Sequence, residues 1–119
     1  MKKLTKQSNI FKSVSDPTRL RIIKMLQLKP LCVCEISDVT GLSASTISEH
    51  LSILRDNGVI LSEKKGKIVY NRLNFYSETE SVQALLSIIS CLMADDETVR
   101  TDKVKAKKAD CREILARKP

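Results

Sequence analysis

The sequence predicts a small, mainly α-helical domain that carries one β-hairpin. Its 119 residues suffice for one hydrophobic core and require no second one. Over most of the chain, leucine, isoleucine and valine recur at intervals of three and four residues, which is the period of an amphipathic helix. Residues 59–73 differ, because β-branched and aromatic residues flank the turn-forming Lys65-Gly66-Lys67 there.

Charge and hydropathy narrow the class of protein. A formal net charge of +7 at pH 7 attracts polyanions, chiefly nucleic acid or an anionic membrane surface. The longest apolar stretches are interrupted well before the roughly 20 residues that a membrane-spanning helix needs. The opening residues, MKKL, are not followed by the apolar region of an export signal. We therefore expect a cytoplasmic protein without a membrane partner, whose four cysteines are reduced thiols.

Two helices are expected before the first cysteine. Residues 4–14 have the pattern of a short helix, and a second helix should follow directly. Asp16 can cap this second helix, Pro17 can occupy its first position, and Pro30 lies beyond its end. Its predicted apolar face consists of Leu20, Ile23, Met25, Leu26 and Leu28, and its predicted solvated side of Arg19, Arg21 and Lys24.

The next two segments have the pattern of a helix-turn-helix. Residues 32–40 form a short apolar repeat that Gly41 ends as a helix C-cap would. Ser43 is a good N-cap for a second helix, which Asn57-Gly58 terminates. Two helices joined by a tight glycine-containing turn are what helix-turn-helix DNA binders require. The hairpin that follows, tipped by Lys64, Lys65 and Lys67, would then be a wing.

The C-terminal third contains a long apolar stripe and a charged end. Residues 77–95 are expected to form a helix of about five turns whose apolar stripe needs a partner surface. We expect this helix and the N-terminal helix to form the interface of a homodimer. Residues 1–95 would thus be a winged helix-turn-helix domain with dimerisation helices, and residues 96–119 a charged C-terminal tail or helix.

Three motifs follow one another in order: SDPTRLRI at residues 15–22, LCVCEI at 31–36 and SASTISEHL at 43–51. Together they resemble the ArsR/SmtB family of metal-sensing repressors. The resemblance covers residues 10–73 closely. It implies a winged helix-turn-helix dimer that binds double-stranded operator DNA and releases it when a metal or metalloid inducer binds.

The predicted DNA-binding surface consists of the second helix of the helix-turn-helix and the hairpin. The helix carries short hydroxyl side chains that suit base edges and phosphates, and the hairpin carries cations that suit phosphates. Glu49 departs from the family pattern, which often has a basic or amide residue there. The predicted DNA-binding residues are Ser43, Ser45, Thr46, Ser48, His50, Arg55, Lys64, Lys65 and Lys67.

Cys32 and Cys34 are the predicted inducer site. Two thiols separated by one residue at the start of a helix can converge on one soft ion, and the helix N-terminus favours the thiolate form. The resemblance implies trivalent arsenic or antimony, which prefer three sulfur ligands. Arsenic-sensing members commonly have a third cysteine where this chain has Ser37.

The third ligand could therefore be Cys91, Cys111 or a small exogenous thiol, and Cys111 is preferred. A site with only two protein sulfurs would suit a methylated arsenical, and cadmium or lead remains an alternative inducer. On a regular helix, Cys91 would point away from the dimer interface.

Two other functions compete with metalloid sensing. The closely spaced cysteines could sense thiol oxidation in a repressor of the same fold, pairing with Cys111. A cysteine-based enzyme of arsenical handling is more remote, because the chain has three glycines and no phosphate-binding loop. His50, the single histidine, offers little material for a histidine-rich zinc site or a Ser-His-Asp triad. We expect a non-enzymatic repressor that needs no cofactor to bind DNA.

Overall fold

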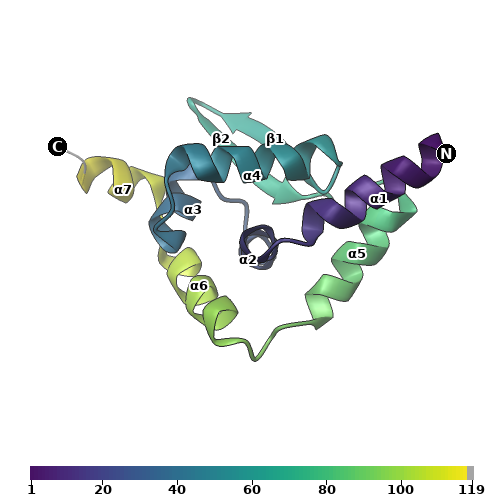
Figure 1. Cartoon of the computed structure of the whole chain (residues 1–119). Helices are drawn as coiled ribbons and strands as arrows, with labels where there is room; N and C mark the ends of the chain where they lie inside the picture. Colours follow the sequence, from purple (N-terminus) through teal and green to yellow (C-terminus); the bar gives the residue numbers. More distant parts are fainter. Residues whose placement is uncertain (118–119) are drawn as a thin grey trace.

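The computed structural model describes residues 1–117. Within this range, the chain forms seven helices and a two-stranded antiparallel sheet, and the sheet lies at one edge of the molecule (Figure 1). The elements are α1 (Lys2–Val14), α2 (Pro17–Leu26), α3 (Val33–Thr40), α4 (Ala44–Asp56), β1 (Ile60–Lys65), β2 (Ile68–Leu73), α5 (Glu80–Cys91), α6 (Glu97–Lys108) and α7 (Cys111–Arg117).

The helix-turn-helix is present where the sequence predicts it. Asp16 caps α2, because its carboxylate accepts a hydrogen bond from the backbone N–H of Arg19 at 3.0 Å. Gly41 ends α3 in the left-handed conformation, at φ 76°. Ser43 caps α4 through the backbone N–H of Thr46. Local capping chemistry thus sets the boundaries of α2, α3 and α4.

The predicted hairpin is also confirmed. β1 and β2 pair from Ile60 opposite Leu73 to Lys65 opposite Ile68. Gly66 in the turn has a φ of 64°, a conformation that glycine adopts without steric cost. Fold and element order are therefore those of a winged helix-turn-helix.

The core is built around α2, which lies at the centre of the molecule and contacts α1, α4, α6 and β2 (Figure 1). Ile22, Ile23 and Met25 are completely buried. Leu28, which the periodicity assigns to the same apolar face, is instead 45% exposed because α2 already ends at Leu26.

Two cations expected on the solvated side of α2 are held by distant parts of the chain. Lys24 is buried, and its ammonium donates hydrogen bonds to the carbonyls of Ile89 and Leu92 at the end of α5, at 3.0 and 2.7 Å. This burial lowers the pKa of Lys24. Arg21 pairs with Asp102 of α6. The prediction was wrong here because the partners are more than sixty residues away and leave no trace in local periodicity.

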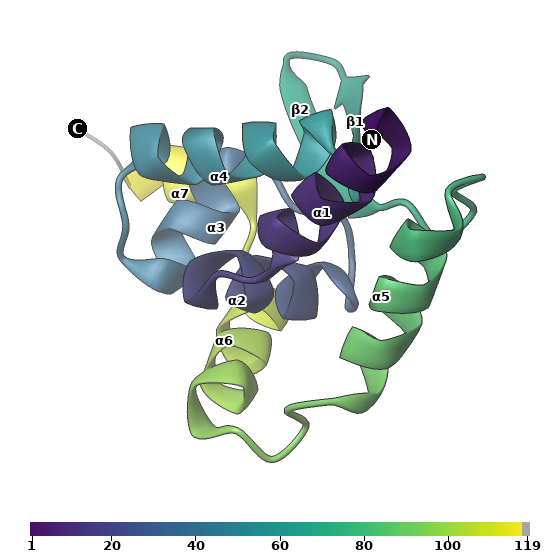
Figure 2. The same ribbon diagram turned by 45° about the vertical axis from the view of Figure 1, so that its right-hand side comes forward.

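The segment after β2 differs from the single long helix expected over residues 77–95. α5 ends at Cys91, and Met93 adopts the left-handed conformation at φ 62° before the chain reverses. α6 then packs on α2 and α3, and α7 packs on α3 (Figure 2). The segment expected as a charged tail or helix, residues 96–119, thus contains two helices up to Arg117, and residues 118–119 lie outside the described range. The buried side chains of these two helices include Val99, Ala106 and Ile114.

The apolar stripe of α5 is covered by the chain itself. Its central residues Val82, Leu86 and Ile89 are buried, and α5 packs on α1. A second apolar strip, which includes Ile88 and Leu92, stays exposed. Among residues 1–117, no helix combines the length and hydropathy that crossing a membrane requires.

The ion pair between Arg21 and Asp102 yields a stability prediction. Asp102 is buried, and its two oxygens accept bonds of 2.8 and 3.0 Å from the Arg21 guanidinium. Asp102→Ala leaves this guanidinium without its carboxylate and should lower the free energy of unfolding by about 2 kcal/mol. Urea denaturation measures the change. Asp95→Ala, at an exposed aspartate, is the matched control and should change stability by less than about 0.5 kcal/mol; equal effects would contradict the prediction.

Candidate functional site

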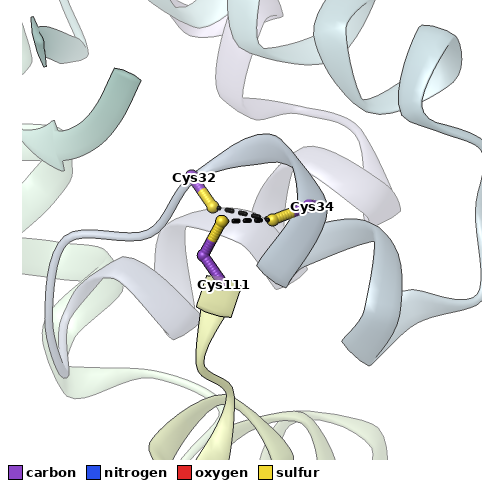
Figure 3. A group of neighbouring side chains, drawn as sticks. All are labelled: Cys32, Cys34 and Cys111. Atoms are coloured by element: carbon purple, nitrogen blue, oxygen red, sulfur yellow. Dashed lines mark hydrogen bonds between the residues drawn. The ribbon is translucent and has the colours of Figure 1, made fainter. Parts of the chain in front are cut away.

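Three cysteine side chains converge between α3 and α7 (Figure 3). Cys32 immediately precedes α3, Cys34 lies in its first turn, and Cys111 is the first residue of α7. The Sγ atom of Cys34 lies 3.1 Å from that of Cys32 and 3.0 Å from that of Cys111. All three sulfur atoms lie within 4.8 Å of one another.

Backbone contacts on both sides hold the cysteines in place. The backbone N–H of Cys32 donates to the Glu35 carboxylate at 2.9 Å, which fixes the start of α3. Leu31, the preceding residue, forms an antiparallel bridge with Asn71 of β2. On the other side, the Lys29 ammonium donates to the carbonyl of Ala109 at 3.0 Å, just before α7.

The three thiols differ in exposure. Cys32 and Cys111 are buried, whereas Cys34 is partly exposed. Burial raises the pKa of the Cys32 thiol well above its ordinary value. The hydrogen bond with Cys34, followed by burial, raises the pKa of Cys111. At Cys32, burial therefore opposes the thiolate form that a helix N-terminus favours.

This arrangement can supply three sulfur ligands to one soft ion. Metal–thiolate bonds are about 2.3 Å long, so one ion can bind two sulfur atoms that are up to about 4.6 Å apart; the separations of 3.1 and 3.0 Å from Cys34 lie within this reach. The cluster draws its ligands from α3 and α7 of the same chain. Cys91 lies outside it, exposed at the end of α5. Ser37 is also engaged elsewhere, because its hydroxyl donates to the Leu42 carbonyl.

The residues predicted to contact DNA lie on α4 and the hairpin, which run along the same side of the molecule in both views (Figures 1 and 2). Ser45 and Ser48 of α4 are exposed, as are the three hairpin lysines. Ser43 is also exposed, although its hydroxyl caps α4, and Thr46 is half-buried beside it. This surface combines hydroxyls and cations, the groups that bind phosphates and base edges.

His50 and Arg55 have structural partners as well. The Nδ1 atom of His50 lies 3.1 Å from the guanidinium of Arg19, which ties α4 to the start of α2. Arg55 is exposed, and its Nε–H donates to the hydroxyl of Ser62 on β1 at 2.8 Å. These contacts orient both side chains in the free protein.

Sequence reasoning missed two residues of this region. Glu35 stands three positions after Cys32, the spacing of a helix capping box, and that spacing could have identified it. Asn71 follows the apolar and aromatic residues Ile68, Val69 and Tyr70 in β2 and is buried. An amide in such a strand is a signal, but its partners lie on other elements.

Comparisons with known proteins agree on one family. A family model described as "Bacterial regulatory protein, arsR family" matches residues 16–62. The transcriptional repressor SdpR of Bacillus subtilis is 34% identical over 83 residues, which cover 70% of this chain and 92% of that protein. The arsenic resistance transcriptional regulator ArsR2 of Pseudomonas putida is 45% identical over 67 residues, or 56% of this chain. The latter match spans only 58% of the relative.

A solved structure supports the fold. The homodimeric winged helix-turn-helix DNA-binding domain Mb0332 of Mycobacterium bovis superimposes with a TM-score of 0.64 at 24% identity. The match covers 79% of this chain and 82% of that one. At this identity, the likeness concerns the fold alone.

The unequal exposure of the three thiols predicts their order of reaction. In the reduced protein, a brief pulse of N-ethylmaleimide should modify Cys34 before Cys32 and Cys111, because Cys34 alone among these three thiols is partly exposed. Peptide mass spectrometry measures the modified fraction of each. Unfolded protein in urea is the control, and all three should react there at similar rates. Modification of Cys111 as fast as Cys34 would contradict the contact between α3 and α7.

Proposed function

Because the chain belongs to the ArsR family of bacterial regulatory proteins, we propose that it represses transcription by binding operator DNA as a homodimer and that trivalent arsenic or antimony releases it. The observation that carries the inducer assignment is the convergence of Cys32, Cys34 and Cys111. Family and fold are those of DNA-binding transcriptional regulators, which speaks against the alternative of a cysteine-based enzyme.

The number and type of ligands support a trivalent metalloid. Arsenic and antimony in this state bind three thiolates, and the cluster offers three sulfur atoms, with Cys111 in the role of third ligand. Arsenite at neutral pH is As(OH)3, so each thiol would replace one hydroxide, which leaves as water with the proton of that thiol. The relative ArsR2 is an arsenic resistance regulator, which favours arsenic as inducer. Cadmium and lead, which also bind thiolates, are the competing inducers.

DNA binding is assigned to α4 and the hairpin. Arg55 and the hairpin lysines would neutralise phosphates, and the exposed hydroxyls of α4 would reach base edges. The assigned residues are Ser43, Ser45, Thr46, Ser48, His50, Arg55, Lys64, Lys65 and Lys67. Glu49 is exposed on the same helix; its charge is unfavourable near phosphates, but its carboxylate could accept a hydrogen bond from a cytosine amino group.

The inducer site adjoins the DNA-binding helix. α3 carries two of the three ligands and packs directly on α4. An ion bound to Cys32, Cys34 and Cys111 would replace the direct contacts between their sulfur atoms by bonds to itself and so shift the start of α3, and α4 with it. Coupling energies of about 1–3 kcal/mol are typical and would weaken operator binding roughly 5- to 150-fold.

The dimer is assigned to α1 and α5. These helices contact each other and leave Phe11, Ile88 and Leu92 exposed, at 54%, 55% and 48% of their surface. Such large exposed apolar residues are typical of an interface. The fold relative Mb0332 is a homodimer. Two-fold symmetry would place the two copies of α4 for two half-sites of one operator.

Thiol oxidation is the second candidate function. The Sγ atoms of Cys34 and Cys111 are 3.0 Å apart. Hydrogen peroxide could oxidise these two thiols to one disulfide, with two molecules of water formed from one peroxide and the two thiol protons. Titration of the operator complex with peroxide and with arsenite, in separate arms, distinguishes the two inducers.

Serine variants test the inducer site. Arsenite should weaken operator binding of the wild type by roughly 5- to 150-fold. In Cys32→Ser and Cys34→Ser, DNA binding should persist while this response disappears, because each variant removes a soft ligand. Cys111→Ser should lose more of the response to arsenite than to a monomethyl arsenical, which needs only two sulfurs. Fluorescence anisotropy measures each affinity, with a labelled operator fragment from the DNA upstream of the protein's own gene.

Cys91→Ser is the matched control and should respond like the wild type, since Cys91 lies outside the cluster. Antimonite, cadmium, lead and zinc serve as competing inducers in the same assay. Release of the Cys32→Ser and Cys34→Ser variants at the wild-type arsenite concentration would refute the proposed sensor.

A second test addresses the dimer. Ile88→Glu places a charge in the proposed interface and should weaken the dimer by at least about 2 kcal/mol, roughly thirtyfold. Sedimentation velocity should show monomers at low micromolar concentration. Val104→Glu, at an equally exposed apolar residue of α6, should remain dimeric. Buried Leu86 and Ile89 are unsuitable, because glutamate there would disrupt the core. If Ile88→Glu remained as dimeric as Val104→Glu, the interface would lie elsewhere.

A further inference from the structure

A continuous chain of hydrogen bonds joins the cysteine site to the DNA-facing surface. It begins at Leu31, the residue bonded to Cys32, and passes through Asn71 of β2 and Ser62 of β1 to Arg55 of α4. The Leu31 carbonyl accepts from the side-chain amide of Asn71 at 3.1 Å. The Oδ1 atom of Asn71 accepts from the Ser62 hydroxyl at 2.8 Å, and the oxygen of that hydroxyl accepts from Arg55 at 2.8 Å.

The end near the cysteines is held rigidly. Besides the side-chain bond, Leu31 and Asn71 exchange two backbone hydrogen bonds of 3.1 and 2.8 Å. Both residues are completely or almost completely buried. The backbone of Cys32 also has little freedom, because its N–H is bound to the Glu35 carboxylate. A change in the backbone of Cys32 is therefore passed to Leu31 and Asn71.

The end of the hydrogen-bond chain near the DNA-facing surface is exposed, so the Arg55 side chain can change its position. Arg55 and Ser62 are exposed, and the bond between them occupies one of the five N–H donors of the guanidinium. Arg55 is exposed, so its other four donors could bind a phosphate. Ser62 stands opposite Asn71 in the hairpin register. Its hydroxyl therefore lies between the side chains of Asn71 and Arg55.

The buried carboxamide links the two ends energetically. An unpaired buried polar group costs about 1–3 kcal/mol, so partners at both its oxygen and its nitrogen stabilise Asn71 in this place. Loss of either partner weakens the remaining bonds of such a network. Packing between α3 and α4 also connects the two sites, but apolar contacts do not orient a guanidinium.

We propose that Asn71 and Ser62 are positioning residues that transmit inducer binding at the three cysteines to Arg55. The proposal rests on the function proposed above. Inducer binding at Cys32 displaces Leu31, which disturbs the bonds of Asn71 and releases Arg55 from the orientation that suits phosphate. Asn71 and Ser62 are neither among the three cysteine ligands nor among the residues assigned to DNA binding.

Ser62→Ala tests this proposal, because Ser62 is exposed and the variant retains the buried pair of Leu31 and Asn71. The measured quantity is the ratio of operator Kd with saturating arsenite to operator Kd without it. Removal of the hydroxyl should reduce this ratio by roughly two- to tenfold. Ser62→Thr keeps the hydroxyl and should retain the wild-type ratio. Arsenite affinity without DNA should be equal in all three proteins.

Linkage provides a second readout. Operator DNA weakens arsenite binding by the same factor by which arsenite weakens DNA binding. Ser62→Ala should therefore bind arsenite more tightly than the wild type when both are saturated with operator. A purely structural role of Ser62 would lower both DNA affinities equally and leave the ratio unchanged, and that result would overturn the proposal. A wild-type ratio of one would instead refute the inducer function itself.

Discussion

Arg21 of α2 binds Asp102 of α6 through two hydrogen bonds, 81 positions apart in the sequence. This ion pair holds α6 against α2 and α3 after the chain has reversed beyond α5. Lys29 holds the carbonyl that precedes α7. Together these contacts bring Cys111 to the start of α3, so the third sulfur of the candidate site depends on how the C-terminal segment docks.

This dependence gives the two parts of the site different characters. Cys32 and Cys34 are local neighbours whose separation is set by the start of one helix. Cys111 arrives on a separate helix, and its sulfur contacts Cys34 only while α7 packs on α3. An ion bound to all three sulfurs would therefore also stabilise the docking of α7, because ligands that bind the folded arrangement favour it by mass action.

The inducer site and the DNA surface share a short path through the protein. α3 packs on α4, and the bridge between Leu31 and Asn71 joins the start of α3 to the hairpin. A small domain of this kind needs no long-range rearrangement to connect the two. The carboxamide of Asn71, which is bonded through both its oxygen and its nitrogen, supplies a directional element that apolar packing lacks.

Sequence by itself determined the local features of this protein. Asp16, Gly41 and Ser43 set the ends of three helices through their own side chains or backbone conformation, and Gly66 set the turn of the hairpin. The spacing of Cys32 and Cys34 was sufficient to identify them as a pair. Each of these features depends on contacts within a few residues, which periodicity and capping patterns report.

Tertiary structure alone decided the rest. It buried Lys24 against the end of α5, ended that helix at Cys91, and covered the apolar stripe that includes Leu86 with the chain itself. It also selected Cys111 over Cys91 as the third thiol of the cluster. These outcomes depend on which distant surfaces meet, and the residues flanking each position carry no signal of a partner sixty to eighty positions away.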